Sequence, residues 1–206
     1  MSARRADRTH APTNLRESIM AVLNFLRKPA PETGSGHAAL EAFLQGYSIE
    51  VMPRTAEKVA DFRALLAPGT RVYIAHIEGT PIEDMVATAA RLARDGYPVM
   101  PHFPARIIRD QATLADWIAR YQGEAGVDQA LLLAGGVTTP HGDFDSSMQL
   151  METGEFDRAG CKRLHVAGHP EGNRDIDPSG GMKNVEDALQ WKQKFSERTD
   201  AQMALA

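Results

Sequence analysis

Residues Arg163–Asp175 read RLHVAGHPEGNRD, and this stretch decides how the fold is interpreted. Leu164, Val166 and Ala167 predict a short buried strand, which glycine and proline end abruptly at residues 168–172. Such a strand places a histidine and a carboxylate at the edge of a sheet. In α/β folds the carboxyl ends of the strands meet at that edge, and ligands bind there. The stretch predicts a ligand-facing strand end, provided that the rest of the chain builds such a sheet.

Strand and helix patterns alternate five times along the chain, and a sixth strand begins near the end of the sequence. Apolar or alternating runs predict strands at residues 47–52, 71–77, 97–102, 129–133, 164–167 and 201–206. Helical spacing and capping residues predict helices at residues 14–28, 37–45, 55–66, 82–95, 113–122, 146–152 and 184–197. Thr55 and Thr80 are the expected N-terminal caps of the third and fourth of these helices, with Pro81 at the first helical position.

Connections of this length between buried strands predict right-handed crossovers and a parallel sheet. Two architectures fit this pattern, an open doubly wound sheet and a (β/α)8 TIM barrel. Neither G-x-G-x-x-G nor G-x-x-x-x-G-K-[ST] follows any predicted strand, which disfavours a nucleotide-binding open sheet. Polar or glycine residues at the carboxyl ends of the strands favour the barrel: Glu50, His76, His102, Gly135, Gly136, His169 and Glu171.

Composition limits the function classes. The 206 residues are 43% hydrophobic, which is enough to form one hydrophobic core. The formal net charge of −4 gives no reason to expect nucleic acid as a partner. The single cysteine, Cys161, cannot form an internal disulfide, so the cytoplasm is the expected compartment. No apolar run reaches about 18 residues, so no membrane span is expected. No apolar stretch follows the N-terminal arginines directly, which disfavours a secretory signal.

Glu50 is the strongest candidate for proton chemistry, because it interrupts a strand of isoleucine, valine and methionine. A buried carboxyl has a raised pKa and can act as a general acid near neutral pH. An ion pair with Arg54 or another arginine is an equally good interpretation. His102 lies at the end of a predicted strand. It can be a functional group or a hydrogen-bonded loop histidine. Gly135 and Gly136 can form a tight turn or allow a ligand to approach the backbone.

A metal centre is the less favoured alternative. His76, His102, His141, His165 and His169, together with Asp143 and Asp145, have the right ligand chemistry for a metal-dependent barrel hydrolase. Their spacing matches no compact pattern such as H-E-x-x-H, and we therefore assign no metal ligand. Cys161 has no histidine at a recognised spacing, so we expect a packing residue and not a nucleophile.

Five strand-end and helix motifs occur in one order along the chain: IEVMP at 49–53, PHFPAR at 101–106, LLLAGG at 131–136, AGHPEGN at 167–173 and DALQWKQK at 187–194. In this order they resemble F-E-F-F-P, P-H-L-T-C-R, L-A-L-R-G-D, A-Y-P-E-G-H and D-L-x-x-L-K-x-K of the methylenetetrahydrofolate reductase family, which are flavin enzymes on a (β/α)8 barrel. No single motif is specific, whereas the ordered set is fairly specific. The resemblance covers the chain from about Ser48 to its end.

The resemblance implies an FAD-dependent oxidoreductase of one-carbon metabolism. Such an enzyme reduces 5,10-methylenetetrahydrofolate to 5-methyltetrahydrofolate, or runs the reverse reaction, with NAD(P)H as the electron source. Glu50 matches the catalytic acid of the family. The resemblance implies FAD contacts at His102, Gly135, Gly136, His169, Glu171, Asp187 and Lys194. The implied partners are a small-molecule folate and, for assembly, a second copy or a partner subunit.

Several positions depart from the family pattern. The Arg and Asp of R-G-D are replaced in Ala134-Gly135-Gly136, the aromatic of A-Y-P-E is His169, and Ala75 stands where a threonine is usual. These departures keep open a second hypothesis, a non-catalytic or repurposed folate- or flavin-binding relative, or a subunit that needs a partner.

The expected organisation is an N-terminal helical extension at residues 1–46 and a TIM-barrel flavin-binding domain at residues 47–206. A complete barrel takes roughly 250 residues, and this chain supplies about six of the eight strands. We expect the sequence to be a fragment of a longer chain. The alternatives are strands supplied by another subunit and a different closure of the sheet.

Overall fold

The computed structural model describes residues 36–199 and 203–205. The chain divides into two compact units, Met1–Gln45 and Gly46–Ala206. In the first unit the described element is helix α2 (Gly36–Phe43), close to the helix predicted at 37–45. The helix predicted at residues 14–28 lies outside the described residues.

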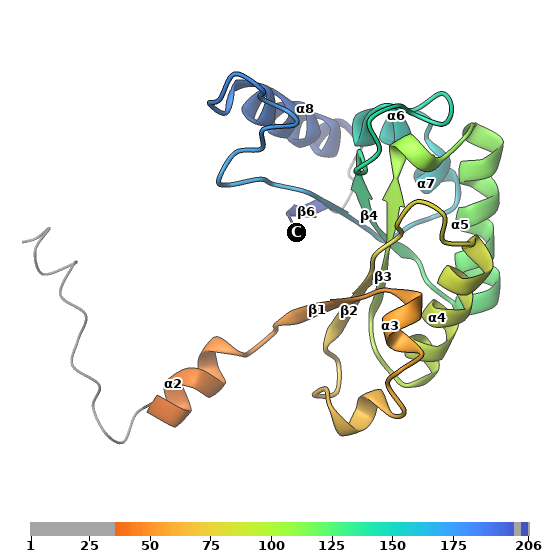
Figure 1. The fold of residues 1–206 in the computed structure, drawn as a ribbon, viewed down its shortest axis with the longest axis vertical. Helices are drawn as coiled ribbons and strands as arrows, with labels where there is room; N and C mark the ends of the chain where they lie inside the picture. Colours follow the sequence, from red (N-terminus) through yellow and green to blue (C-terminus); the bar gives the residue numbers. More distant parts are fainter. Residues whose placement is uncertain (1–35, 200–202, 206) are drawn as a thin grey trace, which may run out of the picture. The chain divides into compact units, whose positions relative to one another are not determined.

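The second unit alternates strands with helices in the predicted order (Figure 1). Its elements are β1 (Ser48–Val51), α3 (Pro53–Ala56), η1 (Phe62–Ala64), β2 (Arg71–Ile74), α4 (Ile82–Arg94), β3 (Val99–Pro104), η2 (Ala105–Ile107), α5 (Gln111–Ala125), β4 (Gln129–Leu133), α6 (Ser147–Glu152), α7 (Glu155–Arg158), β5 (Arg163–Val166), α8 (Lys183–Thr199) and β6 (Met203–Leu205).

The six strands form one sheet in the order β1-β2-β3-β4-β5-β6, and every neighbouring pair is parallel. The predicted α/β class with a parallel sheet is therefore confirmed. The strand order follows the sequence without reversal, whereas a doubly wound sheet reverses its order at a switch point. All carboxyl ends of the strands consequently lie along one edge of the sheet.

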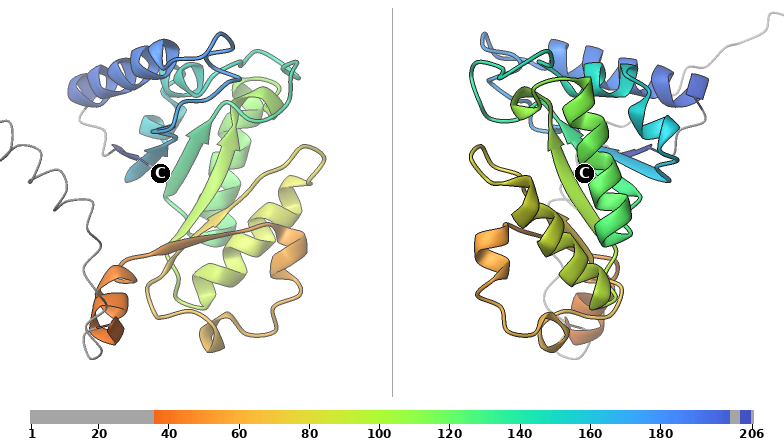
Figure 2. Two further views of the ribbon diagram at one scale, coloured as in Figure 1. Left: turned by 60° about the vertical axis from the view of Figure 1, so that its left-hand side comes forward. Right: turned by 90° about the vertical axis from the view of Figure 1, so that its right-hand side faces the viewer.

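One face of the sheet carries the main hydrophobic core, and helices α4 and α5 pack on this face (Figures 1 and 2). Side chains alternate between the two faces of a strand, so every second residue points toward the helices. Fully buried or nearly buried strand residues on this face are Val72, Ile74, Val99, Phe103, Ala130, Leu132, Leu164 and Val166. Phe195 of α8 belongs to the same core, so the last described helix packs on the same face as α4 and α5.

The intervening strand residues form the other face, which we call the inner face. Strand register aligns Glu50 with Tyr73 and Tyr73 with Met100, and it aligns His102 with Leu131 and Leu131 with His165. Tyr73, Met100 and Leu131 form a small second cluster of buried apolar contacts. The inner face therefore combines a short apolar patch with ionisable side chains close to the carboxyl edge.

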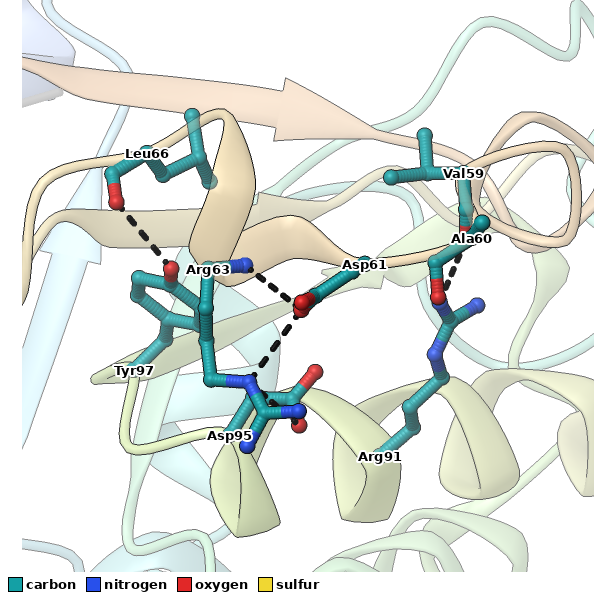
Figure 3. A network of polar contacts seen from close by, with 8 residues as sticks. All are labelled: Val59, Ala60, Asp61, Arg63, Leu66, Arg91, Asp95 and Tyr97. Atoms are coloured by element: carbon teal, nitrogen blue, oxygen red, sulfur yellow. Dashed lines mark hydrogen bonds and ion pairs between the residues drawn. The ribbon is translucent and has the colours of Figure 1, made fainter.

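The single helix predicted at residues 55–66 is wrong, because α3 ends at Ala56 and the 3-10 helix η1 starts only at Phe62. The carbonyl oxygens that would accept the next helical hydrogen bonds are occupied by a side chain from α4 (Figure 3). The Arg91 guanidinium donates to the carbonyls of Val59 and Ala60 (3.2 Å), as Figure 3 shows. It also donates to the carbonyl of Ala56 at 2.9 Å. A tertiary contact thus replaces the local backbone pattern that the sequence favours.

The same segment is fixed at its other end by polar contacts that sequence periodicity does not reveal. Asp61 accepts a hydrogen bond from the backbone N–H of Arg63 at 3.0 Å and so caps η1 (Figure 3). The Tyr97 hydroxyl donates to the carbonyl of Leu66 at 3.3 Å. Thr55 is not the cap of α3: Met52 holds that position, and Thr55 Oγ1 exchanges hydrogen bonds with the Met52 backbone.

Other element boundaries shift by a few residues. Helix α4 is capped by Pro81 and not by Thr80. Helix α5 begins at Gln111, two residues before the prediction, because Asp110 accepts a hydrogen bond from Thr113 N at 2.7 Å. Helix α7, which follows Gly154, was not predicted, because its four residues are too few for a periodic pattern.

Candidate active site

A cavity of about 890 Å³ lies at the carboxyl ends of β1 to β4. Its size suits a small-molecule ligand, since such sites span roughly 300–1,000 Å³. The residues around it come from the ends of β1, β3 and β4, from η2, and from the loops that follow β2 and β4. They are Glu50, Ala75, His76, Ile77, Glu78, His102, Pro104, Ile107, Leu133, Gly135, Gly136, Val137, Thr138, Thr139, Pro140 and His141.

Glu50 and His102 meet in this cavity from β1 and β3. His102 Nε2 lies 3.2 Å from Glu50 Oε2, yet the pair lacks hydrogen-bond geometry, and Nε2 is enclosed without a hydrogen-bond partner. The His102 side chain is 9% exposed and the Glu50 side chain 58% exposed. The expectation of a buried Glu50 is therefore wrong. Because β1 is the edge strand of the described sheet, its inner-face side chain has a neighbouring strand on one side only.

The alternative partner for Glu50 was an arginine. Within residues 36–199, Glu50 approaches His102, and no arginine forms an ion pair with it. Burial, reinforced by His76, lowers the pKa of His102 to about 4. The Glu50 carboxylate pulls in the opposite direction, but it is largely hydrated and so a weak influence. His102 is consequently neutral at pH 7 and can donate or accept a proton through Nε2.

His76 completes the buried side of the cavity. Its Nε2 lies 3.0 Å from the Thr80 carbonyl oxygen, so this nitrogen carries the proton in the neutral ring. The ring packs against Trp117 of α5, with 4.7 Å between ring centroids. Burial lowers the pKa of His76. The loop from β2 to α4 is thus held by a neutral histidine that belongs both to the cavity wall and to the core.

The opposite wall is the loop after β4, and it is attached to η2 by backbone contacts. Arg106 N donates to the Ala134 carbonyl at 2.9 Å, and His141 N donates to the Arg106 carbonyl at 2.8 Å. The Arg106 guanidinium reaches Asp145 Oδ1 at 2.8 Å. The backbone hydrogen bonds and the contact of the Arg106 guanidinium with Asp145 together attach the loop to η2, so this wall of the cavity is held in place by the fold.

The two glycines of this wall differ in what they permit. Gly135 has φ +96°, and a Cβ built there would lie 3.0 Å from Pro104 Cβ, so a side chain is disfavoured by conformation and by space. A Cβ on Gly136 would meet no atom within 4 Å. Gly135 therefore fits the tight-turn interpretation, and Gly136 leaves open space on the cavity wall.

A second histidine–glutamate pair lines the same cavity and was not predicted. Glu78 Oε1, in the loop after β2, lies 2.8 Å from His141 Nε2, in the loop after β4. Both side chains are about half exposed, at 55% and 45%. The loops are far apart in sequence, and neither residue belongs to a recognisable motif, so the sequence carries no signal for this pair.

Four residues expected to contact the cofactor do not line the cavity: His169, Glu171, Asp187 and Lys194. His169 has φ +47°, the left-handed region, directly before a proline, and its Nδ1 lies 3.4 Å from Asn173 Nδ2. Asp187 pairs with Lys183 at 2.5 Å on the exposed surface of α8. Glu171 and Lys194 are exposed. The structure thus brings together Glu50, His102, Gly135 and Gly136 in one cavity and leaves the other four outside it.

A buried lysine on α8 was also missed. Lys192 lies on the core-facing side of the helix with Val185 and Phe195, and its Nζ donates to the carbonyl of Ala167 at 3.3 Å. Burial lowers the pKa of this ammonium group. The resemblance assigned a role to Lys194, the second lysine of D-A-L-Q-W-K-Q-K, and none to Lys192.

Within residues 36–199 and 203–205, no group of three or more His, Cys, Asp or Glu side chains is arranged to hold a metal ion. Burial raises the pKa of Cys161 to about 12, with Asp128 and Asp157 adding to the shift, so this thiol stays protonated at neutral pH. None of the described helices combines the length and apolar character needed to cross a membrane.

Acidification is expected to destabilise the fold well above the pH at which carboxylates titrate. His102 and His165 have a pKa of about 4 in the folded protein, against 6.5 ordinarily, and burial is the main cause. The unfolded chain therefore binds protons first, and stability falls as pH drops from about 6.5 to 4, on the order of 2–3 kcal/mol for each histidine. Urea unfolding at about pH 7, 5.5 and 4.5 measures this loss.

His165→Gln separates this effect from general acid denaturation. Glutamine keeps an acceptor for the Tyr73 hydroxyl, which lies 2.6 Å from His165 Nδ1, but it does not titrate. The loss of stability between pH 7 and 4.5 should be smaller in the variant than in the wild type. Parallel curves for the two proteins would contradict the assignment.

No protein-family model matches the sequence. What the site can do follows from its side chains. A solvated carboxyl group next to a neutral histidine can pass a proton to a ligand in the cavity, and the open wall at Gly136 leaves room for a flat ring.

Proposed function

We propose that the protein is an FAD-dependent oxidoreductase similar to methylenetetrahydrofolate reductases. It would interconvert 5,10-methylenetetrahydrofolate and 5-methyltetrahydrofolate with NAD(P)H. The observation that supports this most is the meeting of Glu50 and His102 in one cavity, because two separate sequence motifs of the family each contribute one of these residues. The sequential parallel strands with helices on one face agree with the (β/α)8 barrel that we propose for the complete fold.

The residues present fit the ring end of a flavin. The cavity is large enough for a three-ring system, and Gly136 places no side chain in its path. In the part of the chain that the structure describes, no lysine or arginine lines this cavity, so we propose that the phosphates lie outside it. Asp187 and Lys194 on α8, with His169 and Glu171 after β5, are the groups that we propose for the ribityl and phosphate region. When bound, the reduced flavin supplies the hydride.

Glu50 supplies the proton in this proposal. Opening the five-membered ring of the methylene adduct requires protonation of a ring nitrogen, which releases an iminium cation that accepts the hydride. The Glu50 carboxyl is exposed enough to be reprotonated from water after each turnover. Neutral His102 lies 3.2 Å away and places no positive charge beside the carboxyl.

A second candidate is a non-catalytic relative that binds flavin or folate, or a subunit that needs a partner. It is favoured by Ala134, Gly135 and Gly136, which lack the arginine and aspartate of the family turn. The cytoplasm remains the compartment that we propose.

Titration with FAD tests the proposal directly. The expected result is a yellow complex whose absorption bands near the flavin maxima shift on binding, with NAD(P)H bleaching them anaerobically. Methylenetetrahydrofolate should then restore the oxidised spectrum as it is reduced. A protein that binds FAD and folate without turnover would support the second candidate. Failure to bind FAD under any condition would exclude the oxidoreductase and the flavin-binding relative.

A further inference from the structure

The cavity has an unusual charge balance for a site that meets an anionic cofactor. Among the described residues that line it, two are carboxylates, Glu50 and Glu78, and none is a lysine or arginine. Each carboxylate faces a histidine, at 3.2 Å for Glu50 and 2.8 Å for Glu78. His102 adds a nine-tenths buried nitrogen without a hydrogen-bond partner. Such a cavity selects a ligand that presents N–H donors and carries no anionic group there.

Glu50 is occupied with proton transfer in the proposed reaction, so Glu78 is the carboxylate that remains for recognition. Glu78 lies in the loop after β2, and its partner His141 lies in the loop after β4. Since His141 N is itself bonded to the Arg106 carbonyl, the pair is anchored to the folded frame. Half of the Glu78 side chain is exposed, so its carboxylate is available to a ligand without unfolding either loop.

The proposed reaction brings two ring systems into the cavity, the flavin and the pterin of the folate. Their hydrogen-bonding groups decide which of them Glu78 can bind. The pyrimidine end of a flavin presents one N–H between two carbonyl oxygens, and a carboxylate is repelled by both carbonyls. The pterin ring of a folate presents an amino group next to a ring N–H. These two adjacent donors match the two oxygens of a carboxylate, as an arginine fork does.

We infer that Glu78, held by His141, binds the aminopyrimidine edge of the folate substrate. The inference rests on the proposed function and adds a substrate-specificity residue that no sequence motif identifies. Gly136, which aligns with an aspartate of the family, offers no side chain for this task. Glu78 is the second carboxylate that lines the same cavity.

The test compares two proteins with two ligands, so that the interaction between the Glu78 carboxylate and the 2-amino group of the folate is measured separately from other effects. The FAD-loaded protein is titrated with 5-methyltetrahydrofolate and with an analogue that lacks the 2-amino group, in the wild type and in Glu78→Gln. Removing a hydrogen bond to a charged group should weaken binding of 5-methyltetrahydrofolate about 10- to 100-fold in the variant. The analogue should bind the wild type and the variant about equally, and FAD affinity should change less than about twofold.

His141→Gln is the matched control, since it removes the partner and keeps the Glu78 carboxylate. It should weaken folate binding less than about threefold. Equal losses in Glu78→Gln and His141→Gln would mean that the pair only fastens the two loops, and the inference would be overturned. The same holds if Glu78→Gln weakens the ligand and its 2-desamino analogue to the same extent. If the wild type binds FAD but binds 5-methyltetrahydrofolate and its 2-desamino analogue equally well, this inference alone is contradicted. If the wild type binds no FAD, the proposed function is contradicted.

Discussion

Glu50→Gln should reduce the turnover of methylenetetrahydrofolate at least about 100-fold while FAD binding stays within about twofold. Glutamine has nearly the shape of glutamate and keeps the contact position 3.2 Å from His102 Nε2. It cannot supply the proton that opens the folate ring. The loss should fall on kcat, because the missing interaction is made only in the transition state.

Menadione as the electron acceptor makes this experiment specific. Electron transfer from NAD(P)H to menadione needs the flavin and no proton from Glu50, so its rate in Glu50→Gln should equal that of the wild type. Glu57→Gln, an exposed glutamate after α3, is the matched substitution outside the cavity and should leave both rates unchanged. Folate turnover within about threefold of the wild type in Glu50→Gln would exclude Glu50 as the acid.

Gly142→Ala should destabilise the protein by about 3 kcal/mol or more, the upper range for an added group in a packed position. A Cβ at residue 142 would lie 1.8 Å from the Arg109 carbonyl oxygen and 2.5 Å from Arg109 Cα. Both are backbone atoms that cannot rotate away. The neighbouring bond from Asp143 N to the same carbonyl, at 2.9 Å, would break as the loop moves.

Gly136→Ala is the control, since it adds the same methyl group to the same loop with no atom within 4 Å. Urea unfolding should show the large loss for residue 142 and a change within about 1 kcal/mol for residue 136. Because the loop is a wall of the cavity, Gly142→Ala should also weaken FAD binding. Equal stability of the two variants would show that the contact between residue 142 and Arg109 is relieved without cost.

The sequence predicted the repetitive part of this fold well. Strands at 129–133 and 164–167 and helices at 82–95 and 184–197 are confirmed within three residues, because their periodic apolar residues are the ones that form the core. The predictions failed where a distant side chain sets the backbone. The helix predicted at 55–66 gives way to contacts from Arg91, which no local pattern contains.

The candidate site shows the same division. Glu50, His102 and the two glycines were found because each follows or interrupts an apolar strand, and parallel strands bring such positions to one edge. The pairing of Glu78 with His141 was missed, since both come from loops whose conformation depends on the whole fold. The prediction that Glu50 is buried was wrong. The exposure of a residue on an edge strand depends on what lies beside the strand, and the residue type does not reveal this.

The Arg91 contacts also bear on the order in which the chain folds. The three carbonyls that Arg91 binds lie 31–35 residues before it in sequence. The connection between α3 and β2 cannot complete its hydrogen bonds until α4 has docked, so it cannot fold as an independent local unit. A segment of this kind forms late and opens together with the helix that holds it, which makes β1, β2 and α4 one cooperative block.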